Sequence, residues 1–327
     1  MDRAETIVQL SPEPLNDDEA FIEDFVECLK LRGSPISTWR NHRSRLRMVA
    51  NYLHAAGYSF TSLDKEALKK TLICLKAREH RGKPISEKAI SNIFSILSSF
   101  CSYLAYMDRI CKNPIPDFKK HYLSAYKKDT RSERRKLLNN EEMAELLNST
   151  LNPLSRAIMA LFAKTGIRRG ELIAIDLQDV NFEKQSIILK PKRKRSNRLV
   201  FFDDEAAFAL SRWIRVRSEY ANEGEKALFV GKEGGRIGQN IVYNIVTERA
   251  ASLGFHNPES LHLEDHFSPH CFRHWFTTSL RQTGMRREFI QELRGDSKKE
   301  TIDIYDHIDP EELRKEYLRC IPRLGLI

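Results

Sequence analysis

Apolar residues recur with the period of an α-helix over residues 16–107, and this repeat constrains the fold more than any other feature. Gly33 and Gly57 interrupt the pattern, and Pro114 predicts the end of the helical region because proline cannot continue a helix. The segments between these signals predict helices over residues 16–33, 37–56, 63–78 and 86–106. Four such helices are enough to form an all-α domain.

The stretch from Lys119 to Lys136 is rich in lysine and arginine, with few acids and few apolar anchors. This composition predicts an exposed, basic linker between two domains. We therefore expect an N-terminal tail over residues 1–15, a helical domain over residues 16–117, a linker over residues 118–136 and a second domain over residues 137–327.

The second region mixes two periods. Short apolar runs at Ser186–Leu189 and Leu199–Phe202 are typical of strands, and the basic stretch Lys190–Arg198 between them predicts a hairpin with a positively charged tip. A small antiparallel sheet beside many helices indicates an α+β domain in a mainly α chain. Helices are predicted over residues 140–147, 153–164, 204–217, 239–253, 269–281 and 286–293, and a last helix begins at Asp309-Pro310.

Composition narrows the function classes. The 327 residues include 54 Lys and Arg against 45 acids, a net charge of +9 that is typical of proteins whose partners carry phosphates. No stretch approaches the roughly 20 apolar residues of a membrane span, and the first residues lack a signal-peptide core. The six cysteines form no C-x-x-C pair, which fits a reducing cytosol and predicts no metal site.

Two short motifs place arginines at helix starts. A Thr-Gly turn delivers Arg168 to the beginning of a helix, three residues before Glu171. Ser268-Pro269 predicts the start of another helix, with His270 and Arg273 on one face of its first turn, where free backbone N–H groups favour an anion. Each motif by itself also fits a structural ion pair or a satisfied surface group.

Two further features carry charge or a nucleophile. The stretch Lys190–Arg198 contains no acid, which fits either a hairpin tip in a nucleic-acid groove or a nuclear localisation signal. The flanking strands favour the hairpin tip. Tyr305 stands beside Asp306 and His307, although a half-buried core residue is the ordinary role of a tyrosine.

Taken in order, Thr-Gly-x-Arg-x-x-Glu, a basic hairpin, His-x-x-Arg-His and a later tyrosine resemble the tyrosine recombinase (phage integrase) family. The resemblance covers the whole second region, and the helical domain ahead of it resembles the family's core-binding domain. It implies the tyrosine recombinase catalytic fold and site-specific recombination of DNA. The Leu-Arg-Gly-Asp-Ser and Ile-Tyr-Asp-His-Ile-Asp segments resemble Xer-like recombinases from archaea.

The resemblance also implies roles for single residues. Arg168 and Arg273 would bind the non-bridging oxygens of the scissile phosphate. Tyr305 would attack the phosphorus to give a 3′-phosphotyrosyl intermediate and a free 5′-hydroxyl, so neither ATP, a metal nor another cofactor is expected. His270 would take part in proton transfer and phosphate binding.

Two positions leave alternatives open. Either Lys192 or Lys194 of the hairpin would protonate the leaving 5′-oxygen. Asp296 stands where the family usually has His or Trp, and an ionised carboxylate accepts hydrogen bonds and repels a phosphate. Asp296 is therefore expected either to impair catalysis or to orient a neighbouring group, with Arg294 or His274 as candidates for the missing donor.

The expected partner is double-stranded DNA, held by a homo-oligomer, a tetramer on two DNA sites, in a cytoplasmic, DNA-associated protein. The terminal helix docks either on a neighbouring protomer or on its own domain. Two other functions share the fold: an architectural DNA-binding protein without turnover and a DNA-relaxing type IB topoisomerase. The arginines expected to contact DNA are Arg40, Arg43, Arg45 and Arg47 of the second helix and Arg193 and Arg195 of the hairpin.

Overall fold

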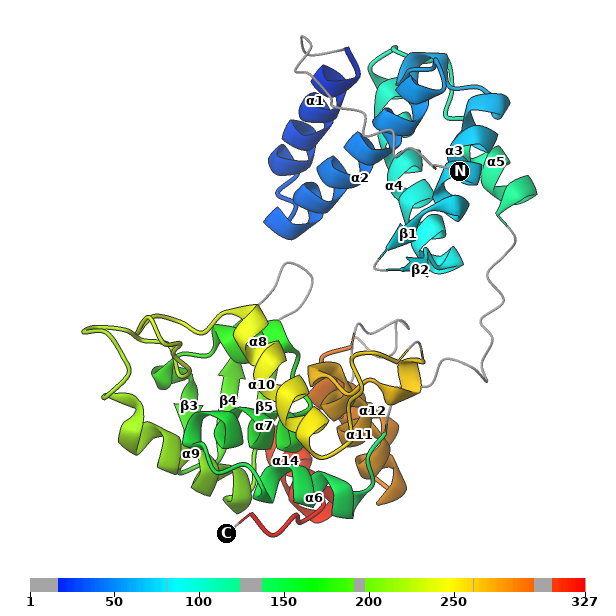
Figure 1. Cartoon of the computed structure of the whole chain (residues 1–327). Helices are drawn as coiled ribbons and strands as arrows, with labels where there is room; N and C mark the ends of the chain where they lie inside the picture. Colours follow the sequence, from blue (N-terminus) through cyan, green and yellow to red (C-terminus); the bar gives the residue numbers. More distant parts are fainter. Residues whose placement is uncertain are drawn as a thin grey trace. The chain divides into compact units, whose positions relative to one another are not determined.

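Helices predominate in the computed structural model, which describes residues 17–80, 82–123, 137–190, 198–260, 262–296 and 308–326. The chain divides into two compact units, Met1–Lys128 and Asp129–Ile327 (Figure 1). The predicted fold class is confirmed, because the second unit combines helices with a small antiparallel sheet. The tail predicted over residues 1–15 lies outside the described residues.

The described part of the N-terminal unit is a helical bundle around one apolar core. Its elements are α1 (Asp17–Leu31), α2 (Ile36–Ala55), α3 (Lys65–Ala77), the two-residue strands β1 (Glu79–His80) and β2 (Lys83–Pro84), α4 (Glu87–Tyr106) and α5 (Ile115–Tyr122). Asp64 and Ser86 begin α3 and α4, because each side chain accepts a hydrogen bond from a backbone N–H of the first turn. Helices α1 to α4 occupy the predicted ranges.

Helix α5 corrects the prediction that helical structure ends at Pro114. The helix begins immediately after Pro114 and carries Pro116 in its first turn, where a missing N–H costs nothing. Phe118 is buried and its ring stacks on that of Phe94 at 5.4 Å. The predicted linker, residues 118–136, therefore begins inside a helix, and residues 124–136 lie outside the described part.

Helix α4 is apolar enough, by length and composition, to cross a membrane, which differs from the expectation that the chain holds no such stretch. Its large apolar residues, such as Phe94, Leu97 and Phe100, are buried in the core of the unit. They pack against the other four helices of the unit. The helix therefore acts as the central core helix of this bundle.

The second unit is organised around α7 (Pro153–Thr165), which is buried along nine consecutive residues from Ala157 to its end. A helix that is buried all round belongs at the centre of a domain. The surrounding described elements are α6 (Asn140–Asn148), α8 (Arg169–Ala174), β3 (Val180–Asn181), β4 (Ser186–Leu189), β5 (Arg198–Phe201), α9 (Asp204–Arg217), α10 (Gln239–Ser252), α11 (Pro269–Gln282), α12 (Arg287–Arg294) and α14 (Pro310–Cys320).

The sheet of the second unit has the antiparallel order β3-β4-β5. Strands β4 and β5 confirm the predicted hairpin, with Ile187 opposite Val200 and Leu189 opposite Arg198. Strand β3 was not predicted, because two residues are too few to show the alternation of apolar and polar side chains that marks a strand. The tip of the hairpin, residues 191–197, lies outside the described residues.

The C-terminal segment packs on its own domain, the second of the two arrangements expected for it. Tyr317 of α14 is fully buried and donates a hydrogen bond to the carbonyl of Lys164 at 2.8 Å. Beyond the helix, Leu324 and Leu326 are buried, and their backbone N–H groups donate to the carboxylate of Glu205. The fully buried Lys164 pairs with Glu205 and binds this tail as well through the carbonyl of Pro322.

Candidate active site

A glycine turn positions Arg168. Helix α7 ends at Gly166, whose φ of +59° belongs to the left-handed region that side chains rarely adopt. A Cβ at this position would stand 2.4 Å from Cδ1 of Phe276, so the turn requires glycine. Arg168 follows two residues later as the N-cap residue of α8, as the motif predicts.

Arg273 reaches the same turn from α11. Ser268 and Pro269 begin this helix as predicted, and Arg273 lies in its second turn with 3% of its surface exposed. Its guanidinium donates to the carbonyl of Gly166 at 2.8 Å and to the carbonyl of Arg294 at 2.8 Å. The structure thus brings two arginines together that are far apart in the sequence.

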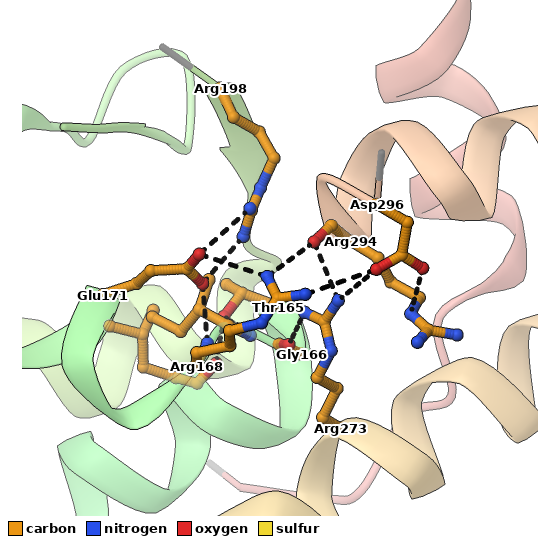
Figure 2. A network of polar contacts seen from close by, with 10 residues as sticks. Thr165, Gly166, Arg168, Glu171, Arg198, Arg273, Arg294 and Asp296 are labelled. Atoms are coloured by element: carbon orange, nitrogen blue, oxygen red, sulfur yellow. Dashed lines mark hydrogen bonds and ion pairs between the residues drawn. The ribbon is translucent and has the colours of Figure 1, made fainter. Parts of the chain in front are cut away.

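Asp296 joins the two guanidinium groups. Its Oδ1 accepts from Nη2 of Arg273 at 3.0 Å and from Nη2 of Arg168 at 3.3 Å. Its Oδ2 lies 3.0 Å from Nε of Arg294 (Figure 2). The carboxylate therefore binds three arginine side chains, among them both arginines that the motifs singled out.

Glu171 holds Arg168 on the other side. It accepts from the backbone N–H of Arg168 at 2.7 Å and from its Nη1 at 3.2 Å. Figure 2 shows the guanidinium of Arg168 between the carboxylates of Glu171 and Asp296. The structural pair of Arg168 and Glu171 that the sequence allowed is therefore present. Arg168 also binds Asp296, which in turn binds Arg273.

Arg198 is a site residue that sequence reasoning missed. It belongs to the basic stretch, yet only 7% of it is exposed and it pairs with Glu171 at 3.0 Å. Burial alone raises the pKa of Glu171, but the hydrogen bonds and charge of Arg198, together with Arg168, outweigh burial and lower that pKa. The sequence signal for Arg198 is the alternation of β5, in which Arg198 lies on the same buried face as Val200.

Hydrogen-bond counting shows what the two arginines can still bind. A guanidinium carries five N–H donors. Among the described residues, Arg273 uses three of them, on Gly166, Arg294 and Asp296. Arg168 also uses three, on Glu171, the carbonyl of Arg294 and Asp296. Each arginine is therefore fixed in orientation and keeps two N–H groups for a ligand.

These arginines line a pocket of about 220 Å³. Its other polar lining residues include His270, Arg169, Tyr243 and Ser268. No described carboxylate lines it, and Asp296 contacts the arginines from outside it. A pocket walled by guanidinium groups without a carboxylate favours an anion with several oxygens, such as a phosphate.

The electrostatics of the pocket point the same way. The pKa of Arg273 is lowered to about 9, first by burial and then by the charges of Arg168 and Arg294. The negative charge of Asp296 offsets part of this shift. Arg273 remains protonated at neutral pH, but its charge is incompletely compensated, and a bound anion would stabilise it.

His270 lies in the first turn of α11 and lines the same pocket as Arg168 and Arg273. Its ring is exposed and meets that of His274, one turn further on, edge to face at 4.7 Å. The predicted grouping of His270 with the two arginines is therefore seen in the described residues. Asp296 binds the side chain of Arg294, the first of the two donors considered for this position.

Both ends of the basic hairpin stretch are held by carboxylates. Lys190, next to the end of β4, pairs with Asp176 and lies 3.5 Å from Asp179. Arg198, at the start of β5, is bound to Glu171. This corrects the prediction that the whole stretch Lys190–Arg198 forms one charged tip, because its two end residues are structural.

Several predicted residues lie outside the described part of the chain. They are the nucleophile candidate Tyr305, the proton-donor candidates Lys192 and Lys194, and the hairpin arginines Arg193 and Arg195. Their roles remain predictions that rest on the sequence.

The arginines of α2 divide into two groups. Arg40, Arg43 and Arg47 line one groove of the N-terminal unit, whereas Arg45 is exposed elsewhere on the helix. Within that groove, the guanidinium of Arg43 lies 5.2 Å from the ring of Trp39. In that groove Arg43 pairs with Glu23 and Arg47 with Glu19, both on α1, and Arg45 does not line it.

Comparisons with known proteins agree with this geometry. Residues 133–312 match the model of the phage integrase family, and residues 19–134 match the phage integrase SAM-like domain. The tyrosine recombinase XerC of Vibrio cholerae is 30% identical over 297 residues, which cover 89% of each chain. The matching recombinases from Vibrio and Psychromonas are bacterial, so the archaeal source expected from the sequence is not supported.

Solved structures show the same fold. The Tn1549 transposon integrase in complex with transposon right end DNA has a TM-score of 0.66 at 21% identity, over 91% of this chain and 98% of the other. The XerH site-specific recombinase bound to its difH substrate has a TM-score of 0.62 at 20% identity, over 91% and 83%. With two converging arginines, the pocket beside them and these matches, the chain belongs to the phage integrase family of tyrosine recombinases.

Proposed function

We propose that the protein is a site-specific recombinase that cleaves and rejoins double-stranded DNA. The observation that carries the proposal is the convergence of Arg168 and Arg273, each with two N–H groups left, on one pocket that also holds His270. These donors suit the two non-bridging oxygens of a phosphodiester. The DNA-bound neighbours of the same fold support duplex DNA as the partner.

The reaction is a transfer of a phosphoryl ester between two hydroxyl groups. The phenol of Tyr305 gives its proton to His270 and its oxygen bonds to phosphorus, while the bond from phosphorus to the 5′-oxygen breaks. Lys192 or Lys194 gives that oxygen a proton, and the product is a 3′-phosphotyrosyl ester. Because the ester keeps the energy of the broken bond, attack by another 5′-hydroxyl reverses the step and rejoins a strand without ATP or a metal.

The charge of the site matches this chemistry. Within the described network, four guanidinium groups meet two carboxylates, those of Glu171 and Asp296. The difference leaves two positive charges to be compensated. A phosphodiester supplies one negative charge in the ground state and gains a second as the five-coordinate transition state forms, so the network favours the transition state.

Asp296 was the sequence feature that favoured a protein without turnover. In the structure it hydrogen-bonds both phosphate-binding arginines and contacts them from outside the pocket, so it supports an orienting role. Nothing among the described residues favours DNA relaxation over strand exchange.

We further propose that the protein assembles as a tetramer on DNA. Four protomers hold two DNA sites, the helical unit clamps the duplex with the arginine groove of α2, and the protein acts in the cytoplasm on DNA. The net charge of +9 and the groove lined by Arg40, Arg43 and Arg47 support this arrangement.

The test is covalent capture. Wild type, Tyr305→Phe and the control Tyr106→Phe, whose ring is 82% exposed on α4, are incubated with nicked duplexes from the DNA that flanks the gene. Loss of the short strand after cleavage traps the adduct for a denaturing gel. We expect adducts with wild type and Tyr106→Phe and none with Tyr305→Phe. An adduct with Tyr305→Phe removes Tyr305 as nucleophile, and no adduct with wild type contradicts the function.

A further inference from the structure

The carboxylate of Asp296 contacts three arginine side chains. Asp296 accepts hydrogen bonds from both phosphate-binding arginines through one oxygen and pairs with Arg294 through the other. A negative charge beside a phosphate site normally weakens phosphate binding. The contacts on the two oxygens explain how this site tolerates it.

We propose that Asp296 and Arg294 form a coupled positioning pair: Asp296 aims Arg168 and Arg273 at the phosphate, and Arg294 neutralises the charge of Asp296. The inference rests on the proposed function and adds the two residues that prepare the phosphate site. Neither residue is assigned a contact with the reacting atoms.

Asp296 can aim the arginines without blocking them. It binds Nη2 of each guanidinium, and each keeps two N–H groups for the ligand. Asp296 is not among the residues that line the pocket, so the phosphate can enter from the side of His270 and Tyr243. An acceptor placed behind two donors fixes their planes before the ligand arrives, which is the preorganisation that electrostatic catalysis requires.

Arg294 is suited to the second task. Its side chain is 32% exposed, and its Nε lies on Oδ2, the oxygen that faces away from the two phosphate-binding arginines (Figure 2). Its backbone carbonyl accepts from Arg168 at 3.1 Å and from Arg273 at 2.8 Å. Because that contact belongs to the main chain, a substitution of the side chain removes the ion pair and keeps the carbonyl in place.

A double-mutant cycle tests the coupling. Wild type, Arg294→Leu, Asp296→Asn and the double variant are compared by the rate of Tyr305-dependent adduct formation at saturating nicked duplex. We expect Arg294→Leu to slow cleavage by on the order of tenfold, because Oδ2 of Asp296 then loses its positive partner and the uncompensated charge weakens phosphate binding. In the Asp296→Asn background, the same substitution is expected to have little effect. Independent losses that multiply in the double variant would overturn the pair.

Controls separate the pair from general damage. Arg281→Leu changes an exposed arginine of α11 and is expected to react like wild type. Arg294→Lys keeps a positive charge next to Asp296 and is expected to recover most of the lost rate. Failure of Arg294→Lys to recover activity, with unfolding midpoints equal to wild type, would contradict charge neutralisation.

A pH profile gives a readout that a structural role would not move. Arg273 faces Arg168 and Glu171 from α8 and its N-cap, and Arg294 and Asp296 from the end of α12. Asp296 raises the pKa of Arg273 and Arg294 lowers it. Among the described residues, His270 and His274 on α11 are further titratable groups, and Arg198 on β5 is bound to Glu171.

An alkaline loss of adduct formation that is caused by Arg273 should therefore move to lower pH in Asp296→Asn, where its pKa falls, and to higher pH in Arg294→Leu, where its pKa rises. Shifts in the same direction in both variants would contradict the assignment. If wild type forms no adduct at any pH, the proposed function fails. If wild type forms the adduct but the rate losses of the two single variants multiply in the double variant, only the positioning pair is contradicted and the proposed function stands.

Discussion

Gly295 lies so close to Arg198 that a Cβ at position 295 would stand 2.2 Å from the Nη1 atom of that arginine. Gly295 ends α12 with a φ of +57°, one residue before Asp296. This close approach brings the end of α12 against strand β5. It therefore places Asp296, which binds Arg168 and Arg273, near the buried pair of Arg198 and Glu171.

Gly295→Ala should therefore lower both stability and cleavage. The left-handed conformation costs an alanine about 1 kcal/mol. Displacement of Arg198 from Glu171 should add about 2 kcal/mol or more. Urea unfolding and adduct formation measure the two effects. Gly284→Ala is the matched control, because Gly284 has a φ of +81° and open space around its Cβ position. Equal losses in the two variants would show that the contact with Arg198 does not matter.

Glu171→Gln should be destabilising in a pH-dependent way. At pH 7 the substitution leaves the buried Arg198 without a charged partner, which should cost about 3 kcal/mol in the free energy of unfolding. The folded-state pKa of Glu171 lies below its usual 4.5, so the stabilisation is complete above that value. It is lost as the pH falls through the folded-state pKa.

The gap between wild type and Glu171→Gln should accordingly narrow from pH 7 to pH 3 in urea unfolding curves. Glu183→Gln, at an exposed position, should leave the unfolding free energy near that of wild type at every pH. A gap for Glu171→Gln that stays constant with pH would show that the charge of Glu171 is not what stabilises Arg198.

The hairpin lysines can be separated by the leaving group. We expect one of Lys192→Ala and Lys194→Ala to slow cleavage by about 10²-fold or more, as removal of a general acid does. A substrate with sulfur at the bridging 5′ position needs no proton on its leaving group, so it should restore the rate of that variant alone. Lys190→Ala is the control, because Lys190 is bound to Asp176 and Asp179 at the base of the hairpin.

The arginines of α2 should differ in their effect on DNA affinity. Arg40→Ala removes a cation from the groove and should reduce the slope of log affinity against log salt by about one unit. Arg45→Ala changes an exposed residue outside that groove and should leave the slope unchanged. Titrations over a range of salt concentrations measure both slopes, and an equal reduction by the two variants would contradict the division of the helix into two faces.

Local signals predicted the local structure well. Ser268-Pro269 and the glycine turn at Gly166 predicted where α11 and α8 begin, because caps and turns depend on neighbouring residues. Arg273 lies in the second turn of α11, one turn later than predicted. The error at α5 has the same origin: Pro114 was interpreted as the end of helical structure, whereas the proline that follows it occupies a first helical turn.

Contacts between distant segments were beyond the reach of the sequence. Arg168 and Asp296 are 128 residues apart, and only the packing of α12 against α11 and β5 brings the carboxylate to the guanidinium. The same holds for Arg198, whose composition assigns it to a charged tip and whose strand position buries it against Glu171. Asp296 was difficult to interpret for this reason, because its role depends on partners that the sequence does not place beside it.

The tail beyond α14 has a consequence for how the enzyme is made. Its carbonyl and N–H groups bind Asn148, Arg156 and Glu205. Asn148 and its partner Leu324 are 176 residues apart in the chain, and Arg156 and its partner Leu326 are 170 residues apart. Contacts between segments so far apart in the chain slow folding, because a long loop must close before they form. A nascent chain on the ribosome therefore carries the arginines of the pocket well before it can close the core behind them. A chain that lacks Leu324 and Leu326 leaves the carboxylate of Glu205 without these backbone donors, so we expect its unfolding midpoint to lie below that of the full chain.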